Sequence, residues 1–283
     1  MFFKRFFLLS ILIFSMGCQS ETSAPGDLSI GVVSFGENER SLEQYSKLEE
    51  YLGRELKSLV DLEPTYNEIK AIAAIEKKSW DIVFAPPGLA AIAISQSKYV
   101  PLFPLEGGLK NRSVVVVLKD SSIQNMRELA GKTLTLGQPG SATGYYLPIY
   151  NLYGLTLSEV RFAATPQAVL KAIADREVDA GAMSLAEFNQ YRSNFPGERF
   201  RILFNDIHEV PNGSVLVSPD LLPSERDKIK EALSEVSPAI AASAGYITSA
   251  PPPDYQYLIE VVERVAPIAE RIKQKPAPLY EQK

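Results

Sequence analysis

Apolar and polar residues follow two alternating patterns along this chain of 283 residues. Short apolar and β-branched runs predict strands, and segments with apolar residues three or four positions apart predict helices. The predicted strands cover residues 28–35, 62–66, 81–85, 99–105, 113–119, 133–136, 160–163, 179–183, 200–204 and 212–218. Helical segments separate most of these strands, and two more follow near 223–236 and 255–272. The alternation predicts an α/β protein.

The order of the elements predicts two lobes. One strand–helix series precedes the long apolar strand near residue 115, a second follows it, and the pattern returns to the first series near residue 210. We assign residues 27–119 plus 209–283 to lobe 1 and residues 120–208 to lobe 2. The hinge is expected near Lys119-Asp120 and in residues 205–211. Ligands in open α/β sheets bind at the carboxyl ends of strands, so a ligand is expected in the cleft between the lobes.

The N-terminus predicts export. Lys4 and Arg5 precede an apolar run over 6–16, which is too short to span a bilayer, so residues 1–17 are interpreted as a signal peptide. Gly17-Cys18 is similar to the end of a bacterial lipobox, which implies lipid attachment to Cys18; the alternative is an ordinary signal peptide cut nearby. Cys18 is the sole cysteine, so no disulfide can form within the chain. Residues 18–26 form a polar tether, and the protein is expected to face the periplasm or cell exterior from its lipid anchor.

Charge and composition argue against several classes of partner and site. Removal of the signal peptide with Lys4 and Arg5 leaves 27 basic and 34 acidic residues, a net charge of −7 that disfavours nucleic acid and anionic lipid as partners. His208 is the only histidine, which argues against a metal site of the histidine–cysteine type. No cofactor motif is found, and we expect no cofactor and no enzymatic activity.

The stretch over 131–148, GKTLTLGQPGSATGYYLP, carries the candidate chemistry. A short strand leads into a turn with Gly137, Gly140 and Gly144, and a helical segment follows. The first N–H groups of a helix have no carbonyl partner, so a phosphate-like group can bind there without lysine or arginine. Ser141 and Thr143 would add hydroxyl donors. The glycine spacing matches neither a P-loop nor a dinucleotide-binding fingerprint, and the turn could equally be ordinary helix capping.

Several segments together resemble one family. They are similar to segments of the PhnD-like solute-binding proteins of phosphate, phosphite and phosphonate ABC importers. The segments are DIVFAPPG, RSVVVVLKDSSI, the loop with its following YYLP, REVDAGAM and VPNGSVLVSPDLLP. The resemblance covers about residues 28–233. It implies a two-lobed type 2 periplasmic binding protein fold, of the Venus-flytrap kind, with two crossover hinge segments. It also implies a small oxyanion ligand and an ABC permease and ATPase as partners, and we expect a monomer.

The resemblance assigns ligand contacts to Ser141, Ala142 and Thr143 in the loop, where Ala142 replaces a threonine common in the family. Contacts from lobe 1 would be chosen among Ser34, Asn67, Gly88, Asn111 and Arg112.

The chain also departs from the family pattern at Asn67-Glu68, Pro166 and Gly213, where polar groups are common. Their loss argues against an amino-phosphonate, whose ammonium needs a carboxylate. Two alternatives stay open: the protein binds a different small anion, or it reports to a membrane sensor kinase instead of feeding a transporter.

Overall fold

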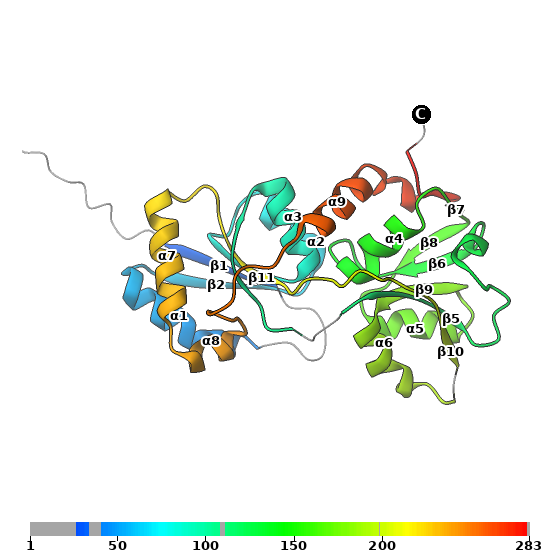
Figure 1. Ribbon diagram of the computed structural model, residues 1–283, viewed down its shortest axis with the longest axis horizontal. Helices are drawn as coiled ribbons and strands as arrows, with labels where there is room; N and C mark the ends of the chain where they lie inside the picture. Colours follow the sequence, from blue (N-terminus) through cyan, green and yellow to red (C-terminus); the bar gives the residue numbers. More distant parts are fainter. Residues whose placement is uncertain (1–26, 34–40, 108–110, 198, 282–283) are drawn as a thin grey trace, which may run out of the picture.

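The structure is a computed structural model that describes residues 27–33, 41–107, 111–197 and 199–281. It consists of two lobes arranged along the long axis of the molecule (Figure 1). The predicted signal peptide, the tether with Cys18, and Ser34 lie outside the described residues. Within the described ranges, no helix combines the length and the apolarity needed to cross a membrane.

Lobe 1 is built on a mixed five-stranded sheet with the order β2-β1-β3-β11-β4. Its strands are β1 (Leu28–Val33), β2 (Val60–Thr65), β3 (Ile82–Ala85), β4 (Val100–Pro104) and β11 (Ser214–Val217). β1 is parallel to β2 and β3, whereas β11 is antiparallel to β3 and β4. The sequence therefore returns to this lobe near residue 214, as the pattern predicted.

Helices cover both faces of the first sheet. They are α1 (Leu42–Leu56), α2 (Glu68–Glu76), α3 (Pro87–Ser97), α7 (Pro223–Glu235) and α8 (Pro238–Ala244). α1, α7 and α8 share one buried apolar cluster with the sheet, and α2 and α3 contribute to another. A capping box begins α1, because the Ser41 N–H donates to Gln44 Oε1 at 2.9 Å.

Lobe 2 contains a second five-stranded sheet with the order β10-β5-β9-β6-β8. Its strands are β5 (Ser113–Leu118), β6 (Thr133–Leu136), β8 (Glu159–Phe162), β9 (Ala180–Ser184) and β10 (Phe200–Asn205). β6 is parallel to β8 and β9, and β5 is antiparallel to β9 and β10. Its helical segments are η1 (Met126–Leu129), η2 (Ala142–Tyr146), α4 (Leu147–Asn151), α5 (Pro166–Ala174), α6 (Leu185–Tyr191) and η3 (Arg192–Asn194).

The strand pairing corrects the predicted boundary at residue 119. β5 pairs with β9 and β10, so it is an interior strand of the second sheet and not a crossing from lobe 1. Its valines are buried on both faces, which explains why it reads as a continuous apolar run. The first crossing therefore lies before Ser113, and the hinge predicted at Lys119-Asp120 is wrong. The second crossing follows β10 and lies close to the first, because the Val210 N–H donates to the Asn111 carbonyl at 2.8 Å.

The C-terminal segment also departs from the assignment of 209–283 to lobe 1. α9 (Gln256–Val265) packs against α3 of lobe 1 and α4 of lobe 2, and Figure 1 shows it between these two helices. β12 (Ala277–Pro278) then pairs with β7 (Thr156–Leu157) of lobe 2. One buried apolar cluster consequently runs from α3 through α9 into lobe 2.

Candidate functional site

The loop over residues 137–144 connects β6 to η2 and is closed on itself by backbone hydrogen bonds. The Gly137 N–H donates to the Gly144 carbonyl at 2.9 Å, and the Ser141 N–H donates to the Gln138 carbonyl at 3.1 Å. Ser141 is the N-cap, and its Oγ accepts from the Gly144 N–H at 3.0 Å. The N–H groups of Ala142 and Thr143 have no acceptor among the described residues. The loop therefore has the free donors that an anion cradle requires.

The helical turn after the loop is held in place by a hydrogen bond from β5 and by buried side chains. Thr143 is buried, and its carbonyl accepts from the Ser113 Oγ on β5 at 2.6 Å. Tyr145 and Tyr146 are buried with ring centroids 5.0 Å apart, in an edge-to-face arrangement. Burial raises the pKa of the Tyr146 phenol to about 12. The backbone that carries the free N–H groups is thus fixed by a buried hydrogen bond and by buried side chains.

The start of α3 in lobe 1 lies directly against this loop. A Cβ added at Gly88 would lie 2.0 Å from the Gly140 carbonyl oxygen and 2.7 Å from the Ala142 nitrogen. Only glycine permits so close an approach of two backbones. The N–H groups of Gly88 and Leu89 also have no acceptor among the described residues. Two helix starts therefore meet between the lobes, each with partial positive charge.

A cavity of about 80 Å³ lies beside this contact. Its wall is formed by lobe 2 together with Glu68 of lobe 1. The lining residues are Glu68, Gly137, Gln138, Ser141, Gly144, Ala163, Ala164, Thr165, Pro166, Val169, Ala182, Met183 and Glu187. The volume suits several waters or one small polyatomic ion. Of the loop residues predicted to bind a ligand, Ser141 lines the cavity, whereas Ala142 and Thr143 lie in the adjoining turn.

The predicted residues of lobe 1 lie in different surroundings. Asn67 is the N-cap of α2, and its side chain accepts from the Lys70 N–H at 3.1 Å. Arg112 forms an ion pair with Glu209 at 3.0 Å, which joins the two crossings. Asn111 lies on the first crossing, and its buried Oδ1 has no hydrogen-bond partner among the described residues. None of the three lines the cavity.

Two cavity residues, Glu68 and Glu187, were not predicted. Glu187 could have been found from its capping box with Ser184: its Oε2 accepts from the Ser184 N–H at 2.8 Å. Glu68 is the first residue of α2, and a Cβ added at Gly140 would lie 3.1 Å from the Glu68 Cβ. The sequence argument against an ammonium-bearing ligand rested on missing carboxylates, and the cavity contains two. Gly213, by contrast, has no space for a side chain, because a Cβ there would lie 2.4 Å from the Ala85 carbonyl oxygen.

His208 takes part in a local network on the second crossing. Its Nδ1 lies 2.9 Å from Asp206 Oδ1, and its ring stacks on Tyr257 with centroids 4.1 Å apart. Asp206 is 1% exposed and also accepts from Asn151 Nδ2 at 2.6 Å. The described part of the chain contains no group of three or more metal-ligating side chains. The histidine thus has a structural explanation in this network.

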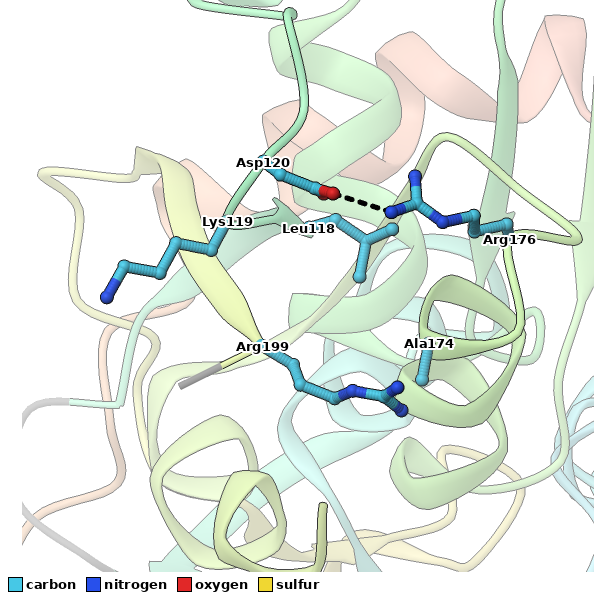
Figure 2. Close-up of a pocket in the computed structure, with 6 residues that line it drawn as sticks. All are labelled: Leu118, Lys119, Asp120, Ala174, Arg176 and Arg199. Carbon is cyan, nitrogen blue, oxygen red and sulfur yellow. Dashed lines mark hydrogen bonds and ion pairs between the residues drawn. The ribbon is translucent and has the colours of Figure 1, made fainter. Parts of the chain in front are cut away.

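A larger, open cavity of about 520 Å³ lies at the other end of lobe 2 (Figure 2). It adjoins the end of β5 at Leu118, whereas the opposite end of β5 pairs with Ser184 on the cleft side. Arg176 is paired with Asp120 at 2.6 Å. Figure 2 shows Arg199 reaching toward Ala174 at the end of α5, where a cation is favourable. These charges are explained by pairing and by the helix terminus, so the interlobe cavity is the candidate site.

Comparison with known proteins agrees with this architecture. Residues 30–257 match the family model of periplasmic substrate-binding proteins of phosphonate ABC transporters. XAC2383 from Xanthomonas citri, solved with chloride, is 20% identical with a TM-score of 0.68, covering 85% of this chain and 99% of that one. PhnD1 from Prochlorococcus marinus, solved with methylphosphonate, is 18% identical with a TM-score of 0.61, covering 85% and 98%.

A third similar structure is PA3383 from Pseudomonas aeruginosa, a binding protein component of an ABC phosphonate transporter. It is 12% identical with a TM-score of 0.60, and the match covers 88% of each chain. These likenesses confirm the two-lobed type 2 periplasmic binding protein fold. Family members bind a small ligand, deliver it to an ABC permease and ATPase, and are not enzymes. The chain belongs to the family of periplasmic substrate-binding proteins of phosphonate-type ABC transporters.

Proposed function

We propose that this protein binds a small phosphorus oxyanion, namely phosphate, phosphite or a phosphonate, between its lobes. The observation that carries the proposal is the meeting of two helix starts whose N–H groups lack acceptors: Gly88 and Leu89 from lobe 1, and Ala142 and Thr143 from lobe 2. The donors come from both lobes, so an oxyanion bound to them favours the closed form. The methylphosphonate in PhnD1 supports the same ligand class.

The free energy of binding that these donors can supply suits a transport protein. A hydrogen bond to a charged group contributes about 1.5 to 3 kcal/mol. Four such bonds together give about 6 to 12 kcal/mol, from which an association cost of at least about 4 kcal/mol is subtracted. The upper part of this range reaches micromolar affinity, about −8 kcal/mol, and the Ser141 hydroxyl on the cavity wall adds to it.

Calorimetry with phosphate, phosphite and methylphosphonate tests the proposal directly. We expect at least one of them to bind with micromolar affinity or better. The double variant Ser141→Ala, Thr143→Ala should bind at least about tenfold more weakly, because it removes hydroxyl donors next to the free N–H groups. Circular dichroism and a thermal melt control for folding. Absence of binding to all three ligands would refute the oxyanion proposal, and unchanged affinity of the double variant would remove these hydroxyls from the site.

We further propose, from the sequence, that Cys18 carries a lipid that holds the mature protein at the membrane as a monomer. The Gly17-Cys18 pair supports this assignment. Mass spectrometry of the mature N-terminus and fractionation of a Cys18→Ser variant test it. A soluble wild-type protein without the added acyl mass would contradict it.

A further inference from the structure

The helical turn that follows the glycine-rich loop is wider than a turn of α-helix. η2 is a π-helix, in which N–H groups donate to the carbonyl five residues earlier. The Tyr146 N–H donates to the Ser141 carbonyl at 3.1 Å. The Leu147 N–H donates to the Ala142 carbonyl in the same register. Such turns are rare and are frequent at functional sites, so the cause of this one bears on the loop that precedes it.

Pro148 prevents this turn from taking the tighter register of an α-helix. It is buried and follows Leu147 directly. An N–H at this position would donate to the Gly144 carbonyl in an α-helix and to the Thr143 carbonyl in a π-helix. Proline has no N–H, and its ring clashes with the carbonyl four residues earlier, which here belongs to Gly144. Pro148 therefore withholds a donor from Thr143 in the π register and from Gly144 in the α register.

Donors from outside the helix bind these two carbonyls. The Ser113 Oγ on β5 donates to the Thr143 carbonyl at 2.6 Å, in a buried hydrogen bond. The Gly137 N–H donates to the Gly144 carbonyl at 2.9 Å and closes the loop on itself. The bond that closes the loop and the bond that ties the turn to β5 both end on carbonyls that Pro148 leaves available.

Ser113 also connects this turn to the two crossings between the lobes. It is the first residue of β5, it directly follows the first crossing, and it is 1% exposed. Its carbonyl accepts from the Asp206 N–H at 2.9 Å, where the second crossing begins. The Thr143 carbonyl is thus linked through one residue to the place where both crossings enter lobe 2.

We propose that Pro148 and Ser113 are positioning residues of the anion site: Pro148 keeps the turn in its wide register, and Ser113 fixes the turn on lobe 2. Neither side chain lines the cavity. Together they hold the N–H groups of Ala142 and Thr143 at the boundary where Gly88 of lobe 1 meets the loop. This inference rests on the proposed function of the same site.

Pro148→Ala tests the register. Alanine supplies an N–H and removes the ring, so the turn can take the more common α register. We expect methylphosphonate to bind at least about tenfold more weakly by calorimetry, because a hydrogen bond to the charged ligand is displaced. In the free protein, hydrogen exchange of the Gly137 amide should be at least about tenfold faster, since its acceptor is taken by the helix. The melting temperature should stay within about 4 °C of wild type, because the new helical hydrogen bond offsets the loss of the ring.

Ser113→Ala tests the anchor through a double-mutant cycle. In wild-type protein it leaves the Thr143 carbonyl buried without a donor, so it should lower the melting temperature and weaken methylphosphonate binding by about fivefold or more. In the Pro148→Ala background, the Leu147 N–H can donate to that carbonyl. The same substitution should then lower the melting temperature by about half as much or less. A purely local role of Ser113 in stability predicts equal losses in both backgrounds.

Two matched controls separate positioning from stability. Pro223→Ala replaces a proline at the same place, the first turn of a helix, but in α7 of lobe 1. Tyr246→Phe removes a buried hydroxyl that donates to the Leu233 carbonyl at 2.9 Å, also in lobe 1. Both variants should bind methylphosphonate as wild type does, although Tyr246→Phe should lower the melting temperature.

The inference and the proposed function fail in different ways. If wild-type protein binds methylphosphonate, and Pro148→Ala binds it within about threefold with unchanged exchange at Gly137, Pro148 does not set the register while the proposed function stands. Equal losses from Ser113→Ala in both backgrounds would show that the two residues do not act on one turn. If wild-type protein binds none of phosphate, phosphite and methylphosphonate, the proposed function fails, and with it the role of both residues in binding. The exchange at Gly137 and the double-mutant cycle need no ligand, so they still decide whether Pro148 and Ser113 fix the loop.

Discussion

Substitution of Gly88 by alanine should prevent the lobes from closing on a ligand. The new Cβ would lie 2.0 Å from the Gly140 carbonyl oxygen and 2.7 Å from the Ala142 nitrogen. Carbon–oxygen contacts are optimal near 3.5 Å, so the two backbones must separate by at least about 1 Å. Both neighbours of the new methyl group are backbone atoms of the loop, so no side-chain rotation can relieve the clash.

The expected loss follows from the number of donors displaced. If the separation removes two hydrogen bonds to the charged ligand, each contributing about 1.5 to 3 kcal/mol, the free energy of binding falls by at least about 3 kcal/mol. That loss corresponds to a rise in Kd of about 100-fold or more. Calorimetry with methylphosphonate measures the change, and small-angle scattering with and without ligand reports whether the lobes still close.

Gly53→Ala is the matched control. Gly53 lies inside α1, and a Cβ there would meet its nearest neighbour, the Ser58 carbonyl oxygen, at an ordinary 3.4 Å. Alanine favours the helix over glycine by about 1 kcal/mol, so a loss of binding confined to Gly88→Ala cannot come from helix propensity. A Gly88→Ala protein that binds within threefold of wild type and closes normally would refute the reasoning.

Three further predictions concern stability, measured by urea denaturation. Gly181→Ala should cost about 1 to 3 kcal/mol, because its Cβ would lie 2.4 Å from Val169 Cγ1; an unchanged midpoint would contradict the packing of α5 on β9. Asp206→Ala should cost about 3 kcal/mol, since the Asn151 amide loses one of its two acceptors and the His208 N–H loses its carboxylate acceptor; a loss below about 1 kcal/mol would argue against the network. Burial raises the pKa of Tyr146 to about 12 from 10.0. The contribution of the neutral phenol to the free energy of unfolding should therefore be complete below pH 10 and disappear as the pH rises to about 12. Tyr146→Phe should flatten that decline, and an identical alkaline profile would contradict it.

Most of the fold could be predicted from local patterns, and the exceptions have a physical cause. Alternating strands and helices predicted the two lobes, and the return to lobe 1 predicted near residue 210 corresponds to β11, which begins at Ser214. β5 was placed in the wrong lobe because its uninterrupted apolar run gives no information about which strands it pairs with. The position of α9 across both lobes was likewise hidden, since its apolar stripe fits either partner.

The candidate site was also predicted only in part from the sequence. The glycine-rich loop and Ser141 were recognisable because helix capping is a local property with a local sequence signal. Asn67 was named as a possible contact, but it caps its own helix, while its neighbour Glu68 reaches the cavity. Nothing in the sequence around Glu68 or Glu187 indicates that they share a wall, because 118 positions separate them.

The sequence by itself predicted export, the two-lobed α/β class and the glycine-rich loop that follows a strand of lobe 2. Those features depend on runs of neighbouring residues, whose periodicity and capping are fixed by short-range backbone geometry. Only the tertiary structure decided that Gly88 touches the loop backbone and that Glu68 faces the same cavity as Glu187. These relations depend on how the lobes pack, and packing joins residues that are remote in the chain and have no local signal of their meeting.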